Sequence, residues 1–409
     1  MSSKKYRSLA VVVDSYYPEI TSAALQMEQL VTALATQAQN LHVFVPRELQ
    51  NRLVEVEKSN NKTIHYFKMV KPAGNKRIRR FFYEFLMPFR MAYRLHKMSL
   101  WPKKLDGVVF YSPSIFLSPL ILLIKLRYGC KSFLILRDLF PDWLVDLGIL
   151  KKRLIFLFFK GFEYLQYIVS DFIGVQSDSD LLVIKRRIRF FNCETFVMPN
   201  WITIDNQFAF KKVVSQSSSA IREFKIVYAG NLGTSQNIQA IKTVIDVAQG
   251  HGITITFISR GDRLEELQSY VTQKEYKHVE FRSLMDFDKL VDFFQKCDLG
   301  LVTLDLRHTS GHVPGKFVSY VSCGLPVLCI AGRANNLGKI VTQNQLGDFI
   351  YDDSRKSIEQ SVKKLSEKFV FCGLEEKMRH RARISNYAYN NFSTEGASLT
   401  VINSLFNKN

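Results

Sequence analysis

Two successive runs of alternating apolar strands and helical segments constrain the fold of this chain more than any other feature. In the first half, short runs such as Leu9 to Val13 and Gly107 to Tyr111 are apolar throughout, and most are separated by helical segments. Strands that are apolar on both faces, with helices between them, predict a parallel sheet covered on both sides. A second run of this kind begins at Phe224. The sequence therefore predicts two consecutive doubly wound α/β domains, with ligands at the carboxyl ends of their strands.

The order of these segments predicts the elements and the domain boundaries. Strands are expected at Leu9–Val13, Leu41–Val45, Gly107–Tyr111, Ser132–Leu136, Asp171–Val175, Thr195–Met198, Phe224–Ala229, Ile253–Ile258, His278–Phe281, Leu299–Leu304 and Pro326–Ile330. Helical periodicity is clear at Ala23–Ala38 and Gln236–Gln249, and the chain from Arg355 onward is expected to be helical. We expect a first domain at residues 1–203 and a second at 204–392, with a polar linker or loop at 206–223. A last helix, at about 393–409, is expected to pack back on the first domain.

The cysteine pattern and the N-terminus favour a cytoplasmic protein. The six cysteines of this 409-residue chain are scattered, with no Cys-x-x-Cys pair, which argues against a zinc site or a disulfide scaffold and fits a reducing compartment. The chain leads from a polar start directly into a strand, so we expect no signal peptide. The apolar run from Ser112 to Ile124 contains two prolines and is too short to span a bilayer.

The charge balance predicts an anionic partner. The chain has 56 basic and 37 acidic residues, a net charge of +19, which suits nucleic acid, anionic lipid or phosphorylated substrates. Residues 76–104 hold nine lysines and arginines against one acid, Glu84, interleaved with aromatic and aliphatic residues. Residues 151–160 and 185–191 also combine basic residues with bulky apolar ones. A solvated basic face on core-packing helices would need the same charges, and arginines with aromatics can also stack on bases.

We favour a membrane surface as the partner of these segments. The basic residues accompany bulky aliphatic clusters, as in helices that lie in the plane of an anionic leaflet. No recognised nucleic-acid module is present, so no nucleic-acid partner is predicted. The hypothesis is a protein peripheral on the inner face of the cell membrane, held there through 76–104 and 151–160.

The stretch from Gly311 to Leu328 is the strongest candidate for an anion site. It reads as a loop, a short helix, a glycine stop at Gly324 and a buried strand, with Pro314 suited to the first helical turn. Backbone N–H groups and the Lys316 ammonium would converge at such a helix start. An ordinary strand–loop–helix unit with an exposed lysine remains the alternative.

A glycine loop follows the first strand of the second domain and opens a helix. This setting, formed by Gly230-Asn231-Leu232-Gly233-Thr234-Ser235, is typical of loops that bind phosphate. The spacing is not that of a Walker A loop, and a purely structural turn would need the same glycines. Arg260 ends the next strand, where it could face a diphosphate or pair with Asp262.

Polar residues also follow the strands of the first domain. Asp14 and Tyr17 come after the first strand, and Arg137 and Asp138 come after the strand that ends at Leu136. Both groups fall at carboxyl ends of strands, where ligands are expected. Asp138 and Asp142 are not spaced like a metal-binding pair, and no metal site is predicted.

Five stretches, taken together and in this order, resemble bacterial family 4 glycosyltransferases of the GT-B fold, in the branch that builds O-antigen, capsule and colanic-acid repeat units. They are Tyr16-Tyr17-Pro18-Glu19, Arg137-Asp138-Leu139-Phe140-Pro141-Asp142, Pro199-Asn200-Trp201-Ile202, Tyr228-Ala229-Gly230-Asn231-Leu232-Gly233, and Pro314-Gly315-Lys316 leading to Gly324-Leu325-Pro326-Val327.

The resemblance implies two Rossmann-like, doubly wound domains facing a cleft, the first for the acceptor and the second for the donor. It implies metal-independent transfer, with retention at the anomeric carbon, from a UDP or GDP sugar to a lipid-diphosphate-linked saccharide in surface polysaccharide synthesis. No cofactor is expected beyond this nucleotide-sugar substrate. The implied catalytic residues are Asp138 and Lys316. The implied donor-binding residues are Gly230, Asn231, Gly233, Thr234, Ser235, Arg260, Pro314, Gly315 and Ser319, and the implied acceptor-binding residues are Asp14, Tyr17 and Arg137.

The chain departs from the family pattern at several of these positions. Gly311 and Ser319 stand where the family has two glutamates, the second of which normally holds the nucleotide ribose. Asn231 stands where arginine is usual, and Thr21-Ser22 replace a double glycine. Two hypotheses follow: a glycosyltransferase, or a degenerate, non-catalytic GT-B scaffold of a polysaccharide assembly complex. Asp138 could orient the acceptor hydroxyl or serve as a buried helix cap.

Overall fold

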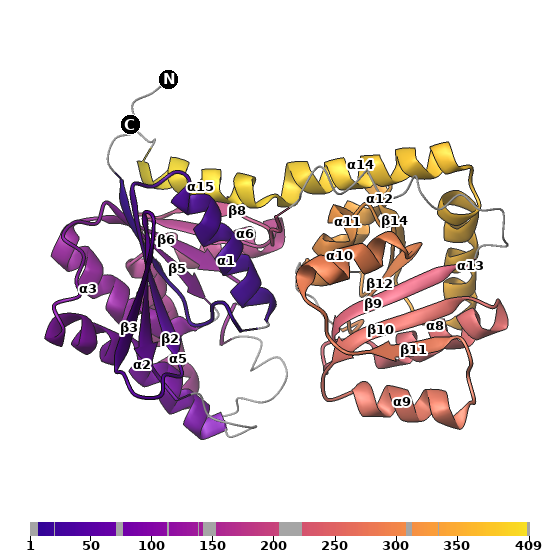
Figure 1. Ribbon diagram of the computed structural model, residues 1–409, viewed down its shortest axis with the longest axis horizontal. Coiled ribbons are helices and arrows are strands. Elements are labelled where there is room, and N and C mark those ends of the chain that lie inside the picture. The colour runs from indigo at the N-terminus through magenta and orange to yellow at the C-terminus, as the bar shows by residue number, and fades with distance from the viewer. Residues whose placement is uncertain are drawn as a thin grey trace. The chain divides into compact units, whose positions relative to one another are not determined.

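The computed structural model describes residues 7–19, 21–70, 77–112, 114–137, 139–141, 153–203, 223–307, 313–333 and 335–406. The chain divides into two compact units, Met1–Pro199 with Thr394–Asn409, and Asn200–Ser393. Figure 1 shows that each unit is built around its own sheet. The linker expected at 206–223 lies outside the described residues, apart from Glu223.

The first unit contains an eight-stranded sheet of order β3-β4-β2-β1-β5-β6-β7-β8. Its strands are β1 (Ser8–Val12), β2 (Asn40–Arg47), β3 (Val54–Ser59), β4 (Lys62–Lys68), β5 (Gly107–Ser112), β6 (Lys131–Leu136), β7 (Phe172–Val175) and β8 (Glu194–Val197). All neighbours pair in parallel except β3 with β4, which are antiparallel. Apart from Gly107 and three serines, the buried residues of β1, β5 and β6 are aliphatic or aromatic, as expected for strands covered on both faces.

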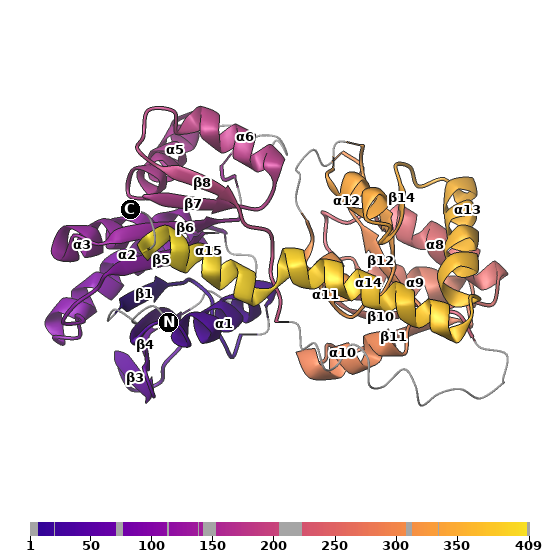
Figure 2. The ribbon, with the colours of Figure 1, turned by 90° about the horizontal axis from the view of Figure 1, so that it is seen from above.

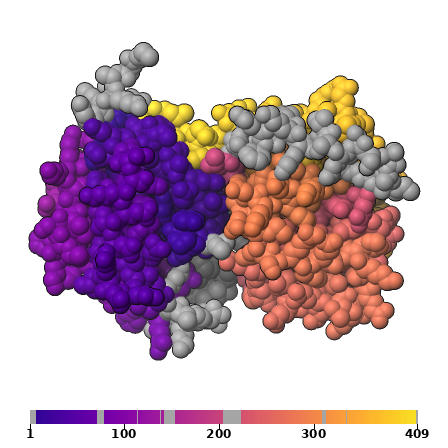
Figure 3. All heavy atoms as spheres, viewed as in Figure 1, coloured from indigo at the N-terminus to yellow at the C-terminus, as the bar shows by residue number. Residues whose placement is uncertain are grey.

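Helices pack on this sheet. They are α1 (Ser22–Ala35), α2 (Arg77–Lys97), α3 (Ser118–Tyr128), α5 (Arg153–Ile168), α6 (Asp178–Arg187) and, from the far end of the chain, α15 (Thr394–Phe406). α15 packs against α1 and β6, and both ribbon views show α1 and α15 in one unit (Figures 1 and 2). A side chain at Gly107 would lie 3.1 Å from Leu405, so the absence of one lets α15 approach β5. In Figure 3 the yellow C-terminal residues accordingly border the indigo atoms of the first half of the chain.

Phenylalanines join α2, α5 and the turn before α3 into one aromatic cluster. Phe81 and Phe85 of α2 stack at 5.8 Å between ring centres, and both contact Phe116 edge-on at 5.7 Å. Phe116 in turn contacts Phe162 of α5 at 5.0 Å. The half-buried rings of α2 and α5 therefore pack around the buried Phe116, each such pair adding about 0.5–1.5 kcal/mol beyond area burial.

The second unit contains a six-stranded, fully parallel sheet of order β11-β10-β9-β12-β13-β14. Its strands are β9 (Lys225–Asn231), β10 (Thr254–Arg260), β11 (Val279–Arg282), β12 (Leu299–Thr303), β13 (Val327–Ile330) and β14 (Gly347–Ile350). From β9, the chain adds β10 and β11 on one side of the sheet. It then crosses to the other side of β9 and adds β12, β13 and β14 there. The gap between the carboxyl ends of β9 and β12 is therefore the topological switch point, where open α/β sheets bind ligands.

The helices of the second unit are α8 (Ile238–Gly250), α9 (Leu264–Gln273), α10 (Phe287–Gln295), α11 (Gly315–Ser322), α12 (Leu337–Gln343), α13 (Arg355–Leu365) and α14 (Leu374–Phe392). α11 packs against α14. Asp298, just before β12, pairs with Lys377 of α14 at 2.6 Å and also accepts the backbone N–H of Lys225 at 3.1 Å. Both side chains of this pair are buried, so Asp298 joins α14 to the start of β9 and β12.

The structure confirms the predicted fold class and the strands expected from apolar runs, with ends shifted by one or two residues. It adds β3, β4 and β14, which the sequence did not predict. β3 and β4 form a hairpin whose outer strand is mostly exposed and polar, so it lacks an apolar run. No helix in the described part of the chain is long and apolar enough to cross a membrane.

Candidate functional site

The carboxyl edge of the second unit's sheet brings together most of the residues that the sequence singled out there. Gly230 and Asn231 end β9, Arg260 ends β10, and Lys316 lies in the first turn of α11, which follows β12. These strands are neighbours in the sheet, so their loops meet at the switch point.

The loop after β9 is fixed by backbone hydrogen bonds to the loops beside it. The N–H of Leu232 donates to the carbonyl of Arg260 at 2.7 Å, and the N–H of Asp305 donates to the carbonyl of Ser235 at 2.9 Å. Gly261 has φ +130°, and a side chain there would overlap the Leu232 carbonyl at 2.3 Å. The loop is therefore held from both sides, by the ends of β10 and β12.

Lys316 reaches from α11 to the last residues of β9. Its Nζ lies 3.9 Å from the centre of the Tyr228 ring and donates a hydrogen bond to the Tyr228 hydroxyl. A side chain on Gly230, whose φ is +127°, would lie 3.5 Å from Lys316 Cε. The lysine thus lies directly beside the first glycine of the loop, and the positive φ of Gly230, rather than a lack of space, favours glycine there.

Tyr320, one turn further along α11, anchors the same helix to β9. Its hydroxyl accepts the N–H of Ala229 at 2.7 Å, and its ring packs where a side chain on Gly300 of β12 would overlap it at 2.4 Å. The recorded register of β9 with β12 covers Ile226 and Val227. Beyond these pairs, α11 side chains rather than β12 contact the end of β9.

The surroundings of Lys316 change its acid–base character. Burial lowers the pKa of the Lys316 amine to about 7, since no nearby anion offsets the loss of hydration. Burial also raises the pKa of Tyr228 well above its usual range, so this phenol stays protonated. An anion placed beside the amine would favour its charged form.

The helix that carries Lys316 begins as the sequence predicted. Pro314 is the N-cap of α11 in an extended conformation, and Gly315 is its first residue. Ser319 lies one turn further on, and its hydroxyl donates to the Gly315 carbonyl at 3.1 Å. The position that resembles the family's ribose-binding glutamate therefore carries a short side chain bonded to its own helix.

The remaining donor-side candidates line the outer part of the loop. Asn231, Thr234, Ser235 and Arg260 are exposed, whereas Gly233 is buried. Two hydroxyls that the sequence did not single out lie inside this edge. Ser259 pairs in register with Gly230, Thr303 ends β12, and among the described residues neither hydroxyl has a hydrogen-bond partner. Buried polar groups are normally paired, so this edge has bonding capacity that the protein does not fill.

In the first unit, the polar residues after β1 form a compact turn. Asp14 is half-buried, whereas Tyr17 is 66% exposed. Ser15 donates to Glu19 at 2.9 Å, and Thr21 caps α1 by accepting the N–H of Ala24 at 3.1 Å. The turn therefore presents Tyr17 outward at the carboxyl edge of β1, beside the start of α1.

Arg137 is placed differently from Tyr17. It lies just after β6, is 8% exposed, and donates from Nη1 to the Met198 carbonyl at 2.7 Å. β5 lies between β1 and β6, so Arg137 and Asp14 are not adjacent along this edge. Asp138 and Gly311 lie outside the described residues.

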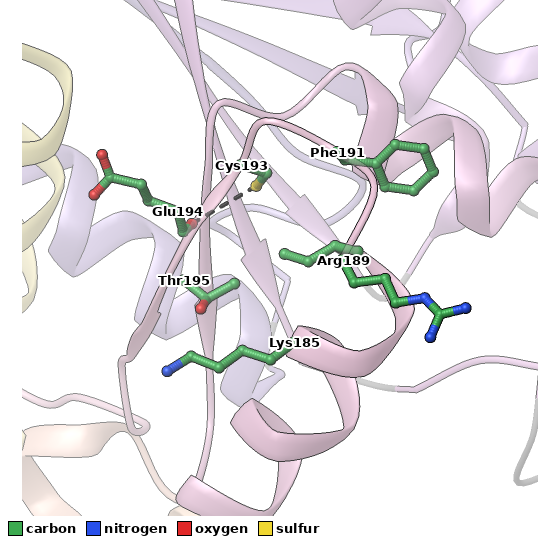
Figure 4. A pocket seen from close by; sticks show the side chains of 7 residues that line it. Lys185, Arg189, Phe191, Cys193, Glu194 and Thr195 are labelled. Atoms are coloured by element: carbon green, nitrogen blue, oxygen red, sulfur yellow. Dashed lines mark hydrogen bonds between the residues drawn. The ribbon is translucent and has the colours of Figure 1, made fainter.

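One cavity of the first unit lies away from the carboxyl edges of both sheets. It has a volume of about 420 Å³ and is lined by the end of α6, the start of β8 and the segment between them, including Lys185, Arg189 and Cys193. Figure 4 shows the Lys185 and Arg189 side chains pointing away from each other, so their charges do not converge. Burial raises the pKa of the Cys193 thiol to about 12, which makes it a poor nucleophile. We therefore assign no binding or catalytic role to this cavity.

No group of three or more histidine, cysteine or acidic side chains within the described ranges could hold a metal ion. The residue that sequence reasoning missed is Tyr228. A tyrosine two positions before a glycine loop, in an otherwise aliphatic strand, is the signal that could have indicated it.

Two curated proteins are similar to this chain in sequence. WbjE of Pseudomonas aeruginosa, which carries the name of a glycosyltransferase, is 23% identical over 235 residues, 55% of this chain and 57% of WbjE. WcaI of Escherichia coli strain K12, which carries the name of a colanic acid biosynthesis glycosyl transferase, is 21% identical over 255 residues, 58% of this chain and 60% of WcaI. The chain thus matches less than two thirds of the length of these relatives. No family model matches it.

Solved structures of glycosyltransferases share the fold over nearly the whole chain. Sucrose-phosphate synthase of Thermosynechococcus elongatus superposes with a TM-score of 0.67 at 11% identity, covering 97% of each chain. WaaG, a glycosyltransferase involved in lipopolysaccharide biosynthesis, gives 0.63 at 10%, covering 98% of this chain and 100% of WaaG. HepE of Anabaena, solved with UDP and glucose, gives 0.64 at 12%, covering 98% and 99%. The predicted GT-B fold and the resemblance to glycosyltransferases are confirmed.

Proposed function

We propose that this protein is a family 4-type glycosyltransferase that moves a sugar from a nucleoside-diphosphate donor to a lipid-linked saccharide in the synthesis of a bacterial surface polysaccharide. The donor binds in the second unit and the acceptor in the first. The sequence relatives WbjE and WcaI and the fold shared with WaaG support the reaction class.

The single observation that carries the proposal is the position of Lys316. Its amine lies beside the first glycine of the β9 loop, at the switch point of a parallel sheet and in the first turn of a helix. Loops of this kind place backbone N–H groups around a phosphate, and the lysine adds a positive charge. HepE, which shares the fold, was solved with UDP, which fits a nucleoside diphosphate at such an edge.

The chemistry follows from the charge that the reaction creates. The bond between the anomeric carbon and the diphosphate oxygen breaks, and the acceptor hydroxyl oxygen bonds to that carbon. The hydroxyl proton passes to a phosphate oxygen of the departing diphosphate. Negative charge develops on the departing diphosphate, where the Lys316 ammonium and the loop N–H groups would stabilise it. A cation and helix N-termini can do this without a divalent ion, so we propose that transfer is metal-independent. We propose retention at the anomeric carbon from the family resemblance.

The outer helices of the first unit support a membrane-bound acceptor. α2, α3 and α5 pack side by side, and large apolar residues remain exposed on all three. On α3 these are Leu122, Leu123 and Leu126, the last 75% exposed, and on α5 Leu154 is 82% exposed. Exposed leucines are ordinary singly, but contiguous ones indicate an interaction surface.

The charges on these three helices favour an anionic partner. Their acids are Glu84 and Glu163. Glu84 pairs with Arg80 at 2.8 Å, and Glu163 is buried between Lys160 and Arg187. Exposed basic residues with bulky apolar residues are typical of surfaces that bind anionic leaflets. We therefore place the protein in the cytoplasm, peripheral on the inner face of the membrane, without a nucleic-acid partner.

A thermal-shift screen against UDP and GDP sugars tests the donor assignment, because a ligand of the folded state raises the melting temperature. One nucleotide sugar should raise it and then serve as donor with membrane extracts as acceptor, with and without EDTA. Equal rates are expected in both. Loss of transfer with EDTA, restored by a divalent ion, would contradict the metal-independent mechanism.

The alternative is a non-catalytic scaffold of a polysaccharide assembly complex. It is favoured by the state of Ser319, whose hydroxyl is bonded to Gly315 and stands where the family holds the ribose. A scaffold need bind neither UDP nor GDP, so a calorimetric titration with both nucleotides separates the two functions.

A further inference from the structure

Tyr228 is a buried, titratable residue at the candidate site to which neither the sequence resemblance nor the reaction chemistry gives a role. Its side chain is fully buried, and its hydroxyl makes two hydrogen bonds. It accepts one from the Lys316 amine and donates the other to the Asn231 carbonyl, at 3.0 Å. The lysine, the tyrosine and the glycine loop therefore form one hydrogen-bonded chain.

The directions of these bonds are set by the chemistry of the groups. A backbone carbonyl only accepts, so the phenolic proton points to Asn231 and a lone pair is left for Lys316. The lysine also lies over the face of the same ring, 3.9 Å from its centre, where the ring quadrupole favours a cation. The tyrosine thus provides two favourable contacts for a charged amine in a place where burial disfavours charge.

Among the described residues, Tyr228 is the hydrogen-bond partner of the Lys316 amine. Burial lowers the pKa of this amine, and no carboxylate among these residues offsets the effect. Gly230 lies beside the lysine side chain but has no polar side-chain group to bind it. In the described part of the site, the amine is therefore held beside the loop by Tyr228.

We propose that Tyr228 is a positioning residue for donor binding: its hydroxyl holds the Lys316 amine against the Gly230 loop and couples the conformation of that loop to the lysine. This rests on the proposed function, in which Lys316 contacts the donor diphosphate. Tyr228 itself need not touch the donor.

A double-mutant cycle on nucleotide affinity tests this role. The variants are Tyr228→Phe, Lys316→Met and both together, titrated calorimetrically with UDP and with GDP. We expect Tyr228→Phe to weaken binding about tenfold, the size of one hydrogen bond to a charged group. In the Lys316→Met background the same change should have no further effect, because the tyrosine acts through the lysine.

The matched control is Tyr276→Phe, which removes a hydroxyl bonded to Asp246 at 2.7 Å in the same unit, and it should leave affinity unchanged. If Tyr228→Phe does not fold, Tyr228→Leu replaces it in the cycle, because leucine also has no hydroxyl that could accept from Lys316.

Two results would overturn the proposal. One is wild-type affinity in Tyr228→Phe. The other is an affinity loss from Tyr228→Phe that is equal in the presence and absence of Lys316. If the wild-type protein binds neither nucleotide, the donor assignment fails together with the role of Tyr228. If it binds and the cycle is additive, only the role of Tyr228 fails.

Discussion

A methyl group added to Gly230 would lie 3.5 Å from Cε of Lys316, although the two residues are 86 positions apart in the sequence. The first glycine of the β9 loop and the first turn of α11 thus form one surface. This surface lies at the switch point of the parallel sheet, where folds of this kind bind ligands. A substitution at either residue should therefore change nucleotide binding.

Gly230→Ala should weaken nucleotide binding about tenfold and destabilise the second unit by about 1–3 kcal/mol. The new methyl would lie at ordinary contact distance from Lys316, but φ +127° is strained for alanine, and relief of this strain would shift the loop beside the lysine. Binding is measured by calorimetry and stability by denaturant unfolding. Gly252→Ala is the matched control, since Gly252 also has positive φ, +65°, but no neighbour within 4 Å. It should lose stability and keep nucleotide affinity; equal affinity losses in both variants would show that strain alone is responsible.

The buried pair of Lys377 and Asp298 should be costly to break. Lys377→Met leaves the Asp298 carboxylate without its cation in a site where both side chains are at most 6% exposed. We expect a loss of about 3–5 kcal/mol in the free energy of unfolding. Arg379→Met, on the same helix, removes an exposed partner of Glu375 and should change stability by less than about 1 kcal/mol. Similar losses in the two variants would contradict the structural role of Asp298.

Two neighbouring histidines should make the protein sensitive to acid. Burial lowers the pKa of His65 to about 4, and it lowers the pKa of His42, whose Nδ1 lies 3.4 Å from Nε2 of His65. In the unfolded chain both titrate near their usual value of about 6.5. Between these values the unfolded state binds more protons, so stability falls as the pH drops from about 6.5 towards 4.

His65→Phe should flatten this part of the stability curve. A phenylalanine keeps the edge contact with Phe44 and cannot be protonated. Urea unfolding at several pH values measures the slope, and His251→Phe, at an exposed site, serves as the control. An unchanged slope in His65→Phe would show that other groups determine the acid response.

The exposed leucines of α3 should matter for membrane binding and not for nucleotide binding. Changing Leu122, Leu123 and Leu126 to serine removes apolar surface that a bilayer would bury, and we expect at least about a tenfold loss of affinity for vesicles containing phosphatidylglycerol. Leu399→Ser, at a residue of α15 that is 50% exposed, is the control. Co-flotation at low and high salt measures the effect. Failure of the wild-type protein to co-float with anionic vesicles at low salt would contradict the membrane proposal.

Much of the fold could be predicted because buried parallel strands are continuous apolar runs. The hairpin partner β3 could not, since its side chains after Val54 are exposed and, apart from Val56, polar. Its pairing with β4 is determined by its neighbours rather than by composition. Lys316 and the Gly230 loop could be placed together because both follow parallel strands of one sheet. The strand order predicts that Lys316 and the Gly230 loop lie at the same edge of the sheet. It does not predict which side chains they contact there.

The contacts within the site depend on side-chain directions that the sequence does not reveal. Tyr228 has the sequence appearance of a core residue, and only its hydroxyl bonds connect it to Lys316. Arg137 looked accessible at a strand end, but its guanidinium is turned inward to the Met198 carbonyl. Its role in acceptor binding stays a prediction, as do the roles of Asp14 and Tyr17. Asp138 lies outside the described residues.

The most direct measurement is a calorimetric titration of the wild-type protein and of Lys316→Ala with UDP and GDP at pH 7. The donor assignment predicts that the wild-type protein binds one of these nucleotides. It also predicts that Lys316→Ala binds it at least about tenfold more weakly, because a charge-assisted contact to phosphate is lost. The variant should retain the wild-type circular dichroism spectrum. Binding of neither nucleotide by the wild-type protein, or equal binding by the variant, would contradict the assignment of this edge to a nucleotide-sugar donor.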